Sequence, residues 1–275
     1  YPLVRTFTLS FSKVTITAKG IKTTPVMFDN YKNAFLSDVK FVDELIQYIG
    51  EIIIFVPIVI VFALVIAMIL NMDLKGKGVL RTIFFLPVII VSGPVMKELV
   101  ESGAATIQGV ADMRIVADIT EMLPGALGTV FSTLIDSFVM ILWFCGVQIL
   151  IFLSALQKID RPVYEAACID GASKWETFWK ITLPTLRPIV IINIVYTVVF
   201  ISTFALNGVI EMIQEYSFAA NYGLGYASAL SFIYFIVMLL ILGLFVKIYG
   251  LRSEADKRLA KKEKKRIQRI RRKMA

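Results

Sequence analysis

The chain reads Glu165-Ala166-Ala167-Cys168-Ile169-Asp170-Gly171 over residues 165–171 and, after nine further residues, Ile181-Thr182-Leu183-Pro184. This polar segment lies between two stretches, 132–155 and 189–209, that are too apolar for a soluble protein. The arrangement predicts a structured loop between two membrane spans.

The first half of this loop has the signals of a short helix. Asp160 is suited to cap it, and Pro162 is tolerated in its first turn. Gly171 fits the left-handed backbone position that ends a helix. Small side chains between these ends keep the helix slim, so that another backbone or a groove wall can approach closely.

The second half opens a second helix. Ser173 and Glu176 form the capping-box pattern, and we expect Pro184 to end the helix. Three aromatic residues crowd apolar area onto it: Trp175, Phe178 and Trp179. From the residues alone, residues 158–188 are either a docking surface or a re-entrant helix pair packed on the protein's own spans.

The composition indicates that the solvent of this chain is lipid. Hydrophobic residues make up 57% of the 275 residues and charged residues only 18%, more apolar surface than one soluble core hides. The absence of histidine excludes a histidine-based catalytic relay, and the two isolated cysteines exclude an ordinary zinc site and a disulfide framework. We therefore expect no redox chemistry and no metal site.

Five segments are long enough to cross a hydrocarbon core as helices: 49–70, 80–99, 132–155, 189–209 and 227–249. Prolines inside them are tolerated in membranes. Residues 1–7 predict the outer end of a further span whose body precedes Tyr1. The expected fold class is therefore all-α, a polytopic membrane protein with five complete transmembrane helices and the end of a truncated first one.

Lysine and arginine near the span ends predict the orientation. Basic residues concentrate between the first two complete spans, in 158–188 and after the last span, which places these regions in the cytoplasm. The loops 100–127 and 211–226 should face outward. We expect three regions in one membrane domain: 1–48 with the end of the first span and an extracytoplasmic segment, 49–250 with the transmembrane spans and the loop 158–188, and 251–275 with a basic cytoplasmic tail.

The loop resembles the EAA loop of permease subunits from binding-protein-dependent ABC importers. The matching positions are Glu165, Ala166, Ala167, Gly171, Ile181, Leu183 and Pro184. Two further segments resemble the sugar branch of that family: Gly78-x-x-Arg81-x-x-Phe84-Phe85-Leu86-Pro87 and Gly225-Tyr226-Ala227-Ser228-Ala229. The resemblance covers about residues 28–250.

The resemblance implies a type I importer permease fold in which the EAA loop docks in a cleft of a cytoplasmic ATPase. Asp170 and Trp175 join the matching residues as expected ATPase-coupling positions. The implied partners are a second homologous permease subunit, two cytoplasmic ABC ATPase domains and an extracytoplasmic solute-binding protein. No nucleotide-binding loop occurs in this chain, so it needs no cofactor and ATP is bound by the partner ATPases.

Two departures from the family pattern limit what carries over. The stretch 207–226 is shorter than in relatives, which weakens the carry-over of contacts with a binding protein there. The chain also has no large extracytoplasmic insert.

Polar and aromatic groups in the spans are candidates for the substrate path, because each buried polar group needs a partner or a cavity. The candidates are Trp143, Gln148, Asn193, Tyr196 and Tyr234. Aromatic faces beside amides suit the C–H face and the hydroxyl edge of a carbohydrate. The alternative for each residue is a hydrogen bond between helices.

Two rival functions remain at this stage. One is an importer for a non-sugar solute, and the other is a membrane scaffold that recruits a cytoplasmic partner without transport. The basic tail is expected to contact anionic membrane lipids, and it shows no readout residues for nucleic acid.

Overall fold

The computed structural model describes residues 2–17, 20–72, 138–204, 206–219 and 222–274, together with single positions between 78 and 128. Side chains of 15–17, 20–21, 138–140 and 251–274 are not described. The predicted span 80–99 and most of the loop 100–127 lie outside the described residues.

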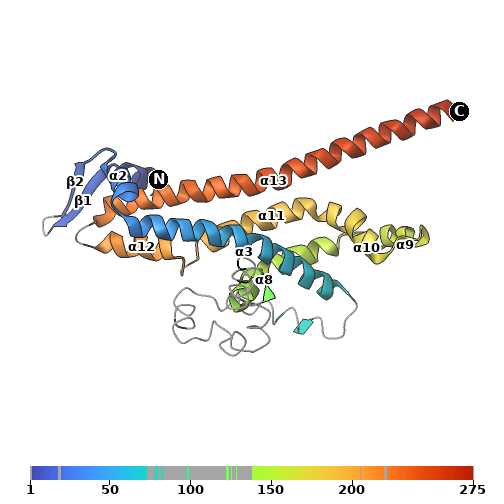
Figure 1. Ribbon diagram of the computed structural model, residues 1–275, viewed down its shortest axis with the longest axis horizontal. Coiled ribbons are helices and arrows are strands. Elements are labelled where there is room, and N and C mark those ends of the chain that lie inside the picture. Colours follow the sequence, from blue (N-terminus) through green and yellow to red (C-terminus); the bar gives the residue numbers. More distant parts are fainter. Residues whose placement is uncertain are drawn as a thin grey trace.

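The described chain consists mainly of helices (Figure 1). In chain order the elements are α1 (Pro2–Ser10), β1 (Ser12–Thr17), β2 (Gly20–Pro25), α2 (Asp29–Leu36), α3 (Val39–Asn71), α8 (Phe138–Leu156), α9 (Arg161–Ile169), α10 (Lys174–Thr177), the π-helix η1 (Phe178–Thr182), α11 (Leu183–Ser202), α12 (Gly208–Phe218) and α13 (Gly223–Met274).

Three described helices are long and apolar enough to cross a membrane: Val39–Asn71, Lys174–Ser202 and Gly223–Gly250. A fourth candidate is the pair Ile141–Leu156 and Arg161–Ile169, which is bent by 67°. The chain is therefore a multi-pass membrane protein, and the predicted spans 49–70 and 227–249 lie inside helices.

The predicted end of the span 189–209 is wrong. The helix ends at Ser202, and a new helix begins at Gly208. The side chain of Asn207 accepts a hydrogen bond of 3.1 Å from the Val209 N–H and so caps α12. The apolar composition around Phe204 concealed this break.

The spans pack around a core of buried hydrophobic side chains. Helix α3 contacts α8 and α11, and α11 also contacts α8 and α13. Ala63 and Ala67 of α3 are fully buried, and such small side chains let membrane helices approach closely. The Cys145 thiol of α8 donates to the Val59 carbonyl at 3.6 Å.

An antiparallel hairpin corrects the all-α expectation. Strands β1 and β2 pair from Ser12 opposite Pro25 to Thr17 opposite Gly20. Strand β1 packs on the start of α13, where a Cβ atom on Gly225 would collide with the Ser12 carbonyl. The sequence of β1 alternates lysine or threonine with valine or isoleucine, which is typical of a strand with one covered face.

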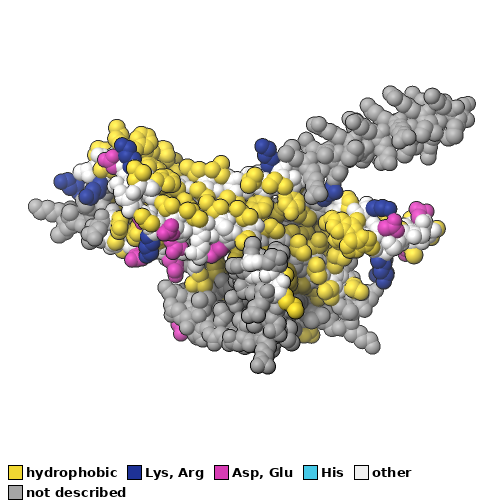
Figure 2. Space-filling model, viewed as in Figure 1, with side chains coloured by type: hydrophobic (Ala, Val, Ile, Leu, Met, Phe, Trp, Pro, Cys, Tyr) yellow, Lys and Arg dark blue, Asp and Glu magenta, His cyan; other side chains and the backbone are white. Residues whose placement is uncertain are grey.

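The two ends of the molecule differ from its middle. Figure 2 shows hydrophobic side chains over most of the central surface and charged side chains towards the ends. The hairpin, α2 and α12 lie at one end, and α9 and α10 lie at the other (Figure 1). An exposed apolar middle of this kind is what a lipid environment requires.

Candidate coupling loop and buried polar group

The first helix of the loop, α9, ends in a complete Schellman motif. Gly171 has φ +78°, in the left-handed region. The Ala172 N–H donates to the Ala167 carbonyl at 2.9 Å, and the Gly171 N–H donates to the Cys168 carbonyl at 3.0 Å. These two bonds satisfy carbonyls that a helix end otherwise leaves unpaired, so the predicted role of Gly171 in ending the helix is confirmed.

The start of α9 differs in one detail from expectation. Asp160 holds the N-cap position, but its side chain makes no capping hydrogen bond. Its backbone carbonyl accepts from the Val163 N–H at 3.1 Å. Pro162 lies in the first turn, where its missing N–H costs no helical hydrogen bond.

The second helix opens with the predicted capping box. The Ser173 hydroxyl accepts from the Glu176 N–H at 3.2 Å, and the Glu176 carboxylate accepts from the Ser173 N–H at 3.1 Å. The Lys180 ammonium also donates to Glu176 at 3.0 Å. Together these bonds fix the turn between the two helices.

Pro184 does not end the second helix, contrary to expectation. The helix runs from Lys174 to Ser202 as one candidate span. Its turn over η1 is widened, and the Leu183 N–H donates to the Phe178 carbonyl five residues earlier. A proline ring clashes with the carbonyl four residues before it and lacks an N–H. The π-turn absorbs this defect without breaking the helix.

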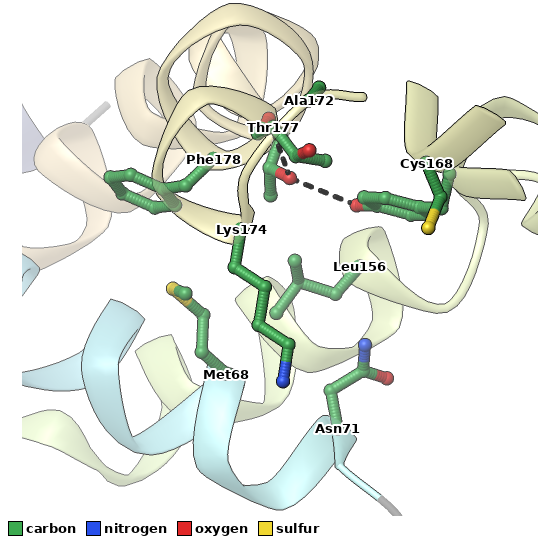
Figure 3. A pocket seen from close by; sticks show the side chains of 10 residues that line it. Met68, Asn71, Leu156, Cys168, Ala172, Lys174, Thr177 and Phe178 are labelled. Carbon is green, nitrogen blue, oxygen red and sulfur yellow. Dashed lines mark hydrogen bonds between the residues drawn. The ribbon is translucent and has the colours of Figure 1, made fainter. Parts of the chain in front are cut away.

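The two arms of the loop are tied together over a cavity of about 330 Å³ (Figure 3). The Tyr164 hydroxyl of α9 and the Thr182 hydroxyl of η1 lie 3.0 Å apart. Lys174 extends into the cavity from the start of α10. The opposite wall consists of Met68 and Asn71 at the end of α3 and Leu156 at the end of α8. The loop and the ends of two spans therefore enclose one cavity.

The predicted coupling residues divide into an outer and an inner set. Glu165, Ala166, Asp170, Gly171 and Trp175 are exposed. Ala167 is buried, and Ile181, Leu183 and Pro184 are half-buried. The motif thus has one exposed face and one side that the rest of the chain covers.

An aromatic cluster, Trp175, Phe178 and Trp179, extends the exposed face. The Trp175 and Trp179 ring centroids lie 5.5 Å apart, and those of Phe178 and Trp179 lie 5.2 Å apart. Trp175 is 70% exposed and Trp179 is 49% exposed. Exposed tryptophans in contact with one another mark a surface that another protein or a membrane covers.

Gln148 of α8 and Asn193 of α11 form a buried polar group with Thr197. All three side chains are 0% exposed. The Gln148 amide nitrogen donates to the Thr197 hydroxyl at 2.9 Å, and that hydroxyl donates to the backbone carbonyl of Asn193 at 2.7 Å. Gln148 Oε1 and both side-chain amide atoms of Asn193 find no hydrogen-bond partner among the described residues. Among the described residues, the hydrogen-bonding capacity of these three atoms is unused.

The other predicted path residues lie apart from this group. Tyr196 is half-buried and stacks on Phe200, with ring centroids 5.7 Å apart. Trp143 is half-buried. The Tyr234 hydroxyl donates to the Ser202 carbonyl at 2.7 Å, and its ring contacts the Tyr48 ring. The structure thus brings Gln148 and Asn193 together and assigns Tyr234 to a separate network.

Three residues of these sites were missed at the sequence level. Thr197 follows Asn193 by four residues, so helical spacing was the signal available for it. Tyr164 and Thr182 join two helices, and no local pattern predicts such a contact. Within the described ranges no group of three or more Cys, Asp or Glu side chains is placed to hold a metal ion.

Residues 34–254 match the family described as binding-protein-dependent transport system inner membrane component. The chain is 32% identical over 235 residues to the probable ABC transporter permease protein YesP of Bacillus subtilis (strain 168), covering 80% of this chain and 74% of YesP. It is 29% identical to the multiple sugar-binding transport system permease protein MsmF of Streptococcus mutans, covering 81% of this chain and 80% of MsmF. It is 28% identical to the lactose transport system permease protein LacF of Rhizobium radiobacter, covering 81% and 71%.

A solved structure shares the fold. It is a chain of the bacterial alginate ABC transporter, crystallised in complex with an alginate pentasaccharide-bound periplasmic protein. The TM-score is 0.56 at 21% sequence identity, covering 82% of this chain and 83% of that chain. The match over most of the chain and the identity to YesP agree. The chain therefore belongs to the family of inner membrane components of binding-protein-dependent transport systems and is a transport component, not an enzyme.

Proposed function

We propose that this chain is a membrane-spanning subunit of an ATP-driven importer and forms the translocation path for a sugar, most simply an oligosaccharide. The observation that carries the proposal is the loop 158–188. It presents a slim helix with Glu165 and Ala166 exposed, and it borders one cavity together with the ends of α3 and α8. A partner that binds the exposed helix could in this way pass its movement to the spans.

The proposed assembly contains a second homologous permease subunit, two cytoplasmic ABC ATPase domains and an extracytoplasmic solute-binding protein. ATP is bound by the ATPase partners. The loop and the basic C-terminus face the cytoplasm in this arrangement. Both lie towards the same end of the molecule in Figure 1, as the orientation requires.

The proposed path runs past the buried polar group. Closure of the ATPases would move Glu165, Asp170 and Trp175, and the continuous helix would carry that movement towards Asn193. Unpaired amide atoms there favour a cargo with many hydroxyl groups, because each cargo hydroxyl both donates and accepts. The names of MsmF and LacF, both permeases of sugar transport systems, support a sugar as cargo.

The test is uptake in cells that lack the chromosomal copy of the gene and carry it on a plasmid. We expect the wild-type chain to restore uptake of at least one of lactose, maltose, trehalose and alginate oligosaccharide. Glu165→Lys reverses the charge on the docking face and should abolish that uptake at normal membrane abundance. Asp43→Lys is the matched control, an exposed acid at the opposite end of the molecule, and should retain it.

Two results would count against the proposal. Normal uptake by the Glu165→Lys chain would reject the coupling role of the loop. Failure of the wild-type chain to restore uptake of any sugar in the panel would reject sugar as the cargo.

A further inference from the structure

A second polar cavity lies at the end of the molecule opposite the coupling loop. Its volume is about 500 Å³, within the range of about 300–1,000 Å³ typical of small-molecule sites. It lies between β1, α2 and the start of α13. This end carries α2 and the hairpin in Figure 1, far from α9 and α10.

One wall of the cavity is aromatic and rigid. Tyr222 and Tyr226 line it. The Tyr222 ring stacks on Tyr216 with centroids 4.0 Å apart and on Tyr226 with centroids 5.2 Å apart. The Tyr226 hydroxyl donates to the Asp38 carboxylate at 2.9 Å, and Asp38 also accepts from the Phe41 N–H at 3.1 Å. The tyrosines are therefore already ordered, and a ligand would lose little entropy in ordering them.

The other wall offers free hydrogen-bonding groups. The carboxylate of Asp29, the amide of Asn33 and the ammonium of Lys13 line the cavity. Within the part of the chain that the structure describes, no hydrogen bond or ion pair engages these three side chains. The cavity thus presents an acceptor, a donor and a group that does both, beside an aromatic surface.

This combination points to a carbohydrate. A pyranose ring has an apolar C–H face that packs on an aromatic ring and an edge of hydroxyls that both donate and accept. Tyr222 is 40% exposed, so part of its ring is open to a ligand. Burial, and then the nearby charge of Asp38, raises the pKa of Tyr216, which stacks on Tyr222.

We propose that this cavity is an outer subsite that binds one sugar unit of the cargo, with its ring against Tyr222 and its hydroxyls paired with Asp29 and Asn33. The inference rests on the proposed function, because it takes the cargo to be a sugar. It goes further in giving the chain a second point of contact, distant from the buried polar group.

The test uses protection of a cysteine from a charged maleimide, in the assembled transporter in lipid nanodiscs without ATP. Ser37→Cys places the reporter on the cavity lining, in a background of Cys145→Ala and Cys168→Ala. The probes are lactose, maltose, trehalose and alginate oligosaccharide. We expect at least one of them to slow labelling. Tyr222→Ala should abolish the protection, whereas Tyr249→Ala, which changes a tyrosine of similar exposure on α13, should preserve it.

A second variant measures the polar wall. Asn33→Ala leaves a cargo hydroxyl unpaired and should raise the half-protecting sugar concentration about tenfold.

The outcomes separate the two proposals. Normal sugar uptake with no protection by any probe overturns the outer subsite and leaves the proposed function standing. Protection that survives Tyr222→Ala and Asn33→Ala also overturns the subsite. Absence of both uptake and protection rejects the sugar function and the subsite with it.

Discussion

Replacing Asn193 by leucine should make the chain more stable to heat and less able to transport. Both side-chain amide atoms of Asn193 are buried without a partner among the described residues. Leucine has the same number of side-chain heavy atoms in the same branched arrangement. Asn193→Leu therefore removes two unpaired polar atoms without opening a cavity.

The size of the effect follows from the hydrogen bonds. A buried polar group without a partner costs about 1–3 kcal/mol, so Asn193→Leu should gain about that amount. Thr197→Val has the opposite effect, because it removes the hydroxyl that accepts from the Gln148 amide at 2.9 Å. Gln148→Met removes one paired donor together with one unpaired acceptor, and its two effects should nearly cancel.

The assay is the fraction of monodisperse protein that survives heating in detergent. All variants are heated at the same rate, because membrane proteins unfold irreversibly and the midpoint depends on the rate. A shift of about 2–4 °C per kcal/mol should place Asn193→Leu above the wild type and Thr197→Val below it. Uptake by Asn193→Leu should fall, since the amide that would bind cargo is gone.

A lower melting midpoint for Asn193→Leu would refute this reasoning, since it would mean that the amide has partners in the folded chain. The predicted loss of transport is tested separately. Gln148→Ala and Asn193→Ala should reduce uptake while the basal ATPase activity of the assembled complex survives. Loss of assembly in both variants would show that these amides hold helices together instead.

Three further predictions concern other parts of the fold. At Gly171, φ +78° strains most residues with a Cβ by about 1–2 kcal/mol, and no atom lies within 4 Å of a Cβ built there. Asparagine tolerates this conformation better than alanine does, so Gly171→Asn should retain more uptake than Gly171→Ala. The reverse order would contradict the Schellman assignment. In a background without the two native cysteines, an impermeant thiol reagent added outside the cell should label Thr24→Cys and not Lys174→Cys; the opposite pattern would invert the predicted orientation. Tyr234→Phe loses the 2.7 Å bond to the Ser202 carbonyl and should lower the melting midpoint by the equivalent of about 1 kcal/mol, whereas an unchanged midpoint would show that water replaces the hydroxyl.

The end of the first loop helix and the start of the second were predictable because they depend on neighbours in sequence. Gly171 must supply its own left-handed conformation, and Ser173 reaches Glu176 within one turn. The long spans were predictable for a similar reason, since apolar length alone determines whether a helix can cross a bilayer.

The features that the sequence did not predict have two causes. Either two local signals oppose each other, or the feature depends on contacts between residues distant in sequence. Pro184 carries a local stop signal, but a widened turn accommodates it and the helix continues. The hairpin was missed because its one covered face packs on α13, about two hundred residues later. Likewise, the Tyr234 hydroxyl has a hydrogen-bond partner in the Ser202 carbonyl. The sequence around Tyr234 does not distinguish such a bonded side chain from one that lines a substrate path.

The continuous helix from Lys174 to Ser202 contains residues of both the loop and the buried polar group, so in the proposed coupling mechanism a tilt of this helix would move both. Trp175 and Asn193 are separated by about 27 Å along its axis at 1.5 Å per residue. A partner that tilts the exposed end about a pivot near Thr182, where Tyr164 holds the helix, swings the other end in the opposite direction. The displacement at Asn193 then exceeds that at Trp175, because Asn193 is farther from the pivot. In the proposed coupling mechanism, a small movement at Trp175 would therefore become a larger movement at Asn193.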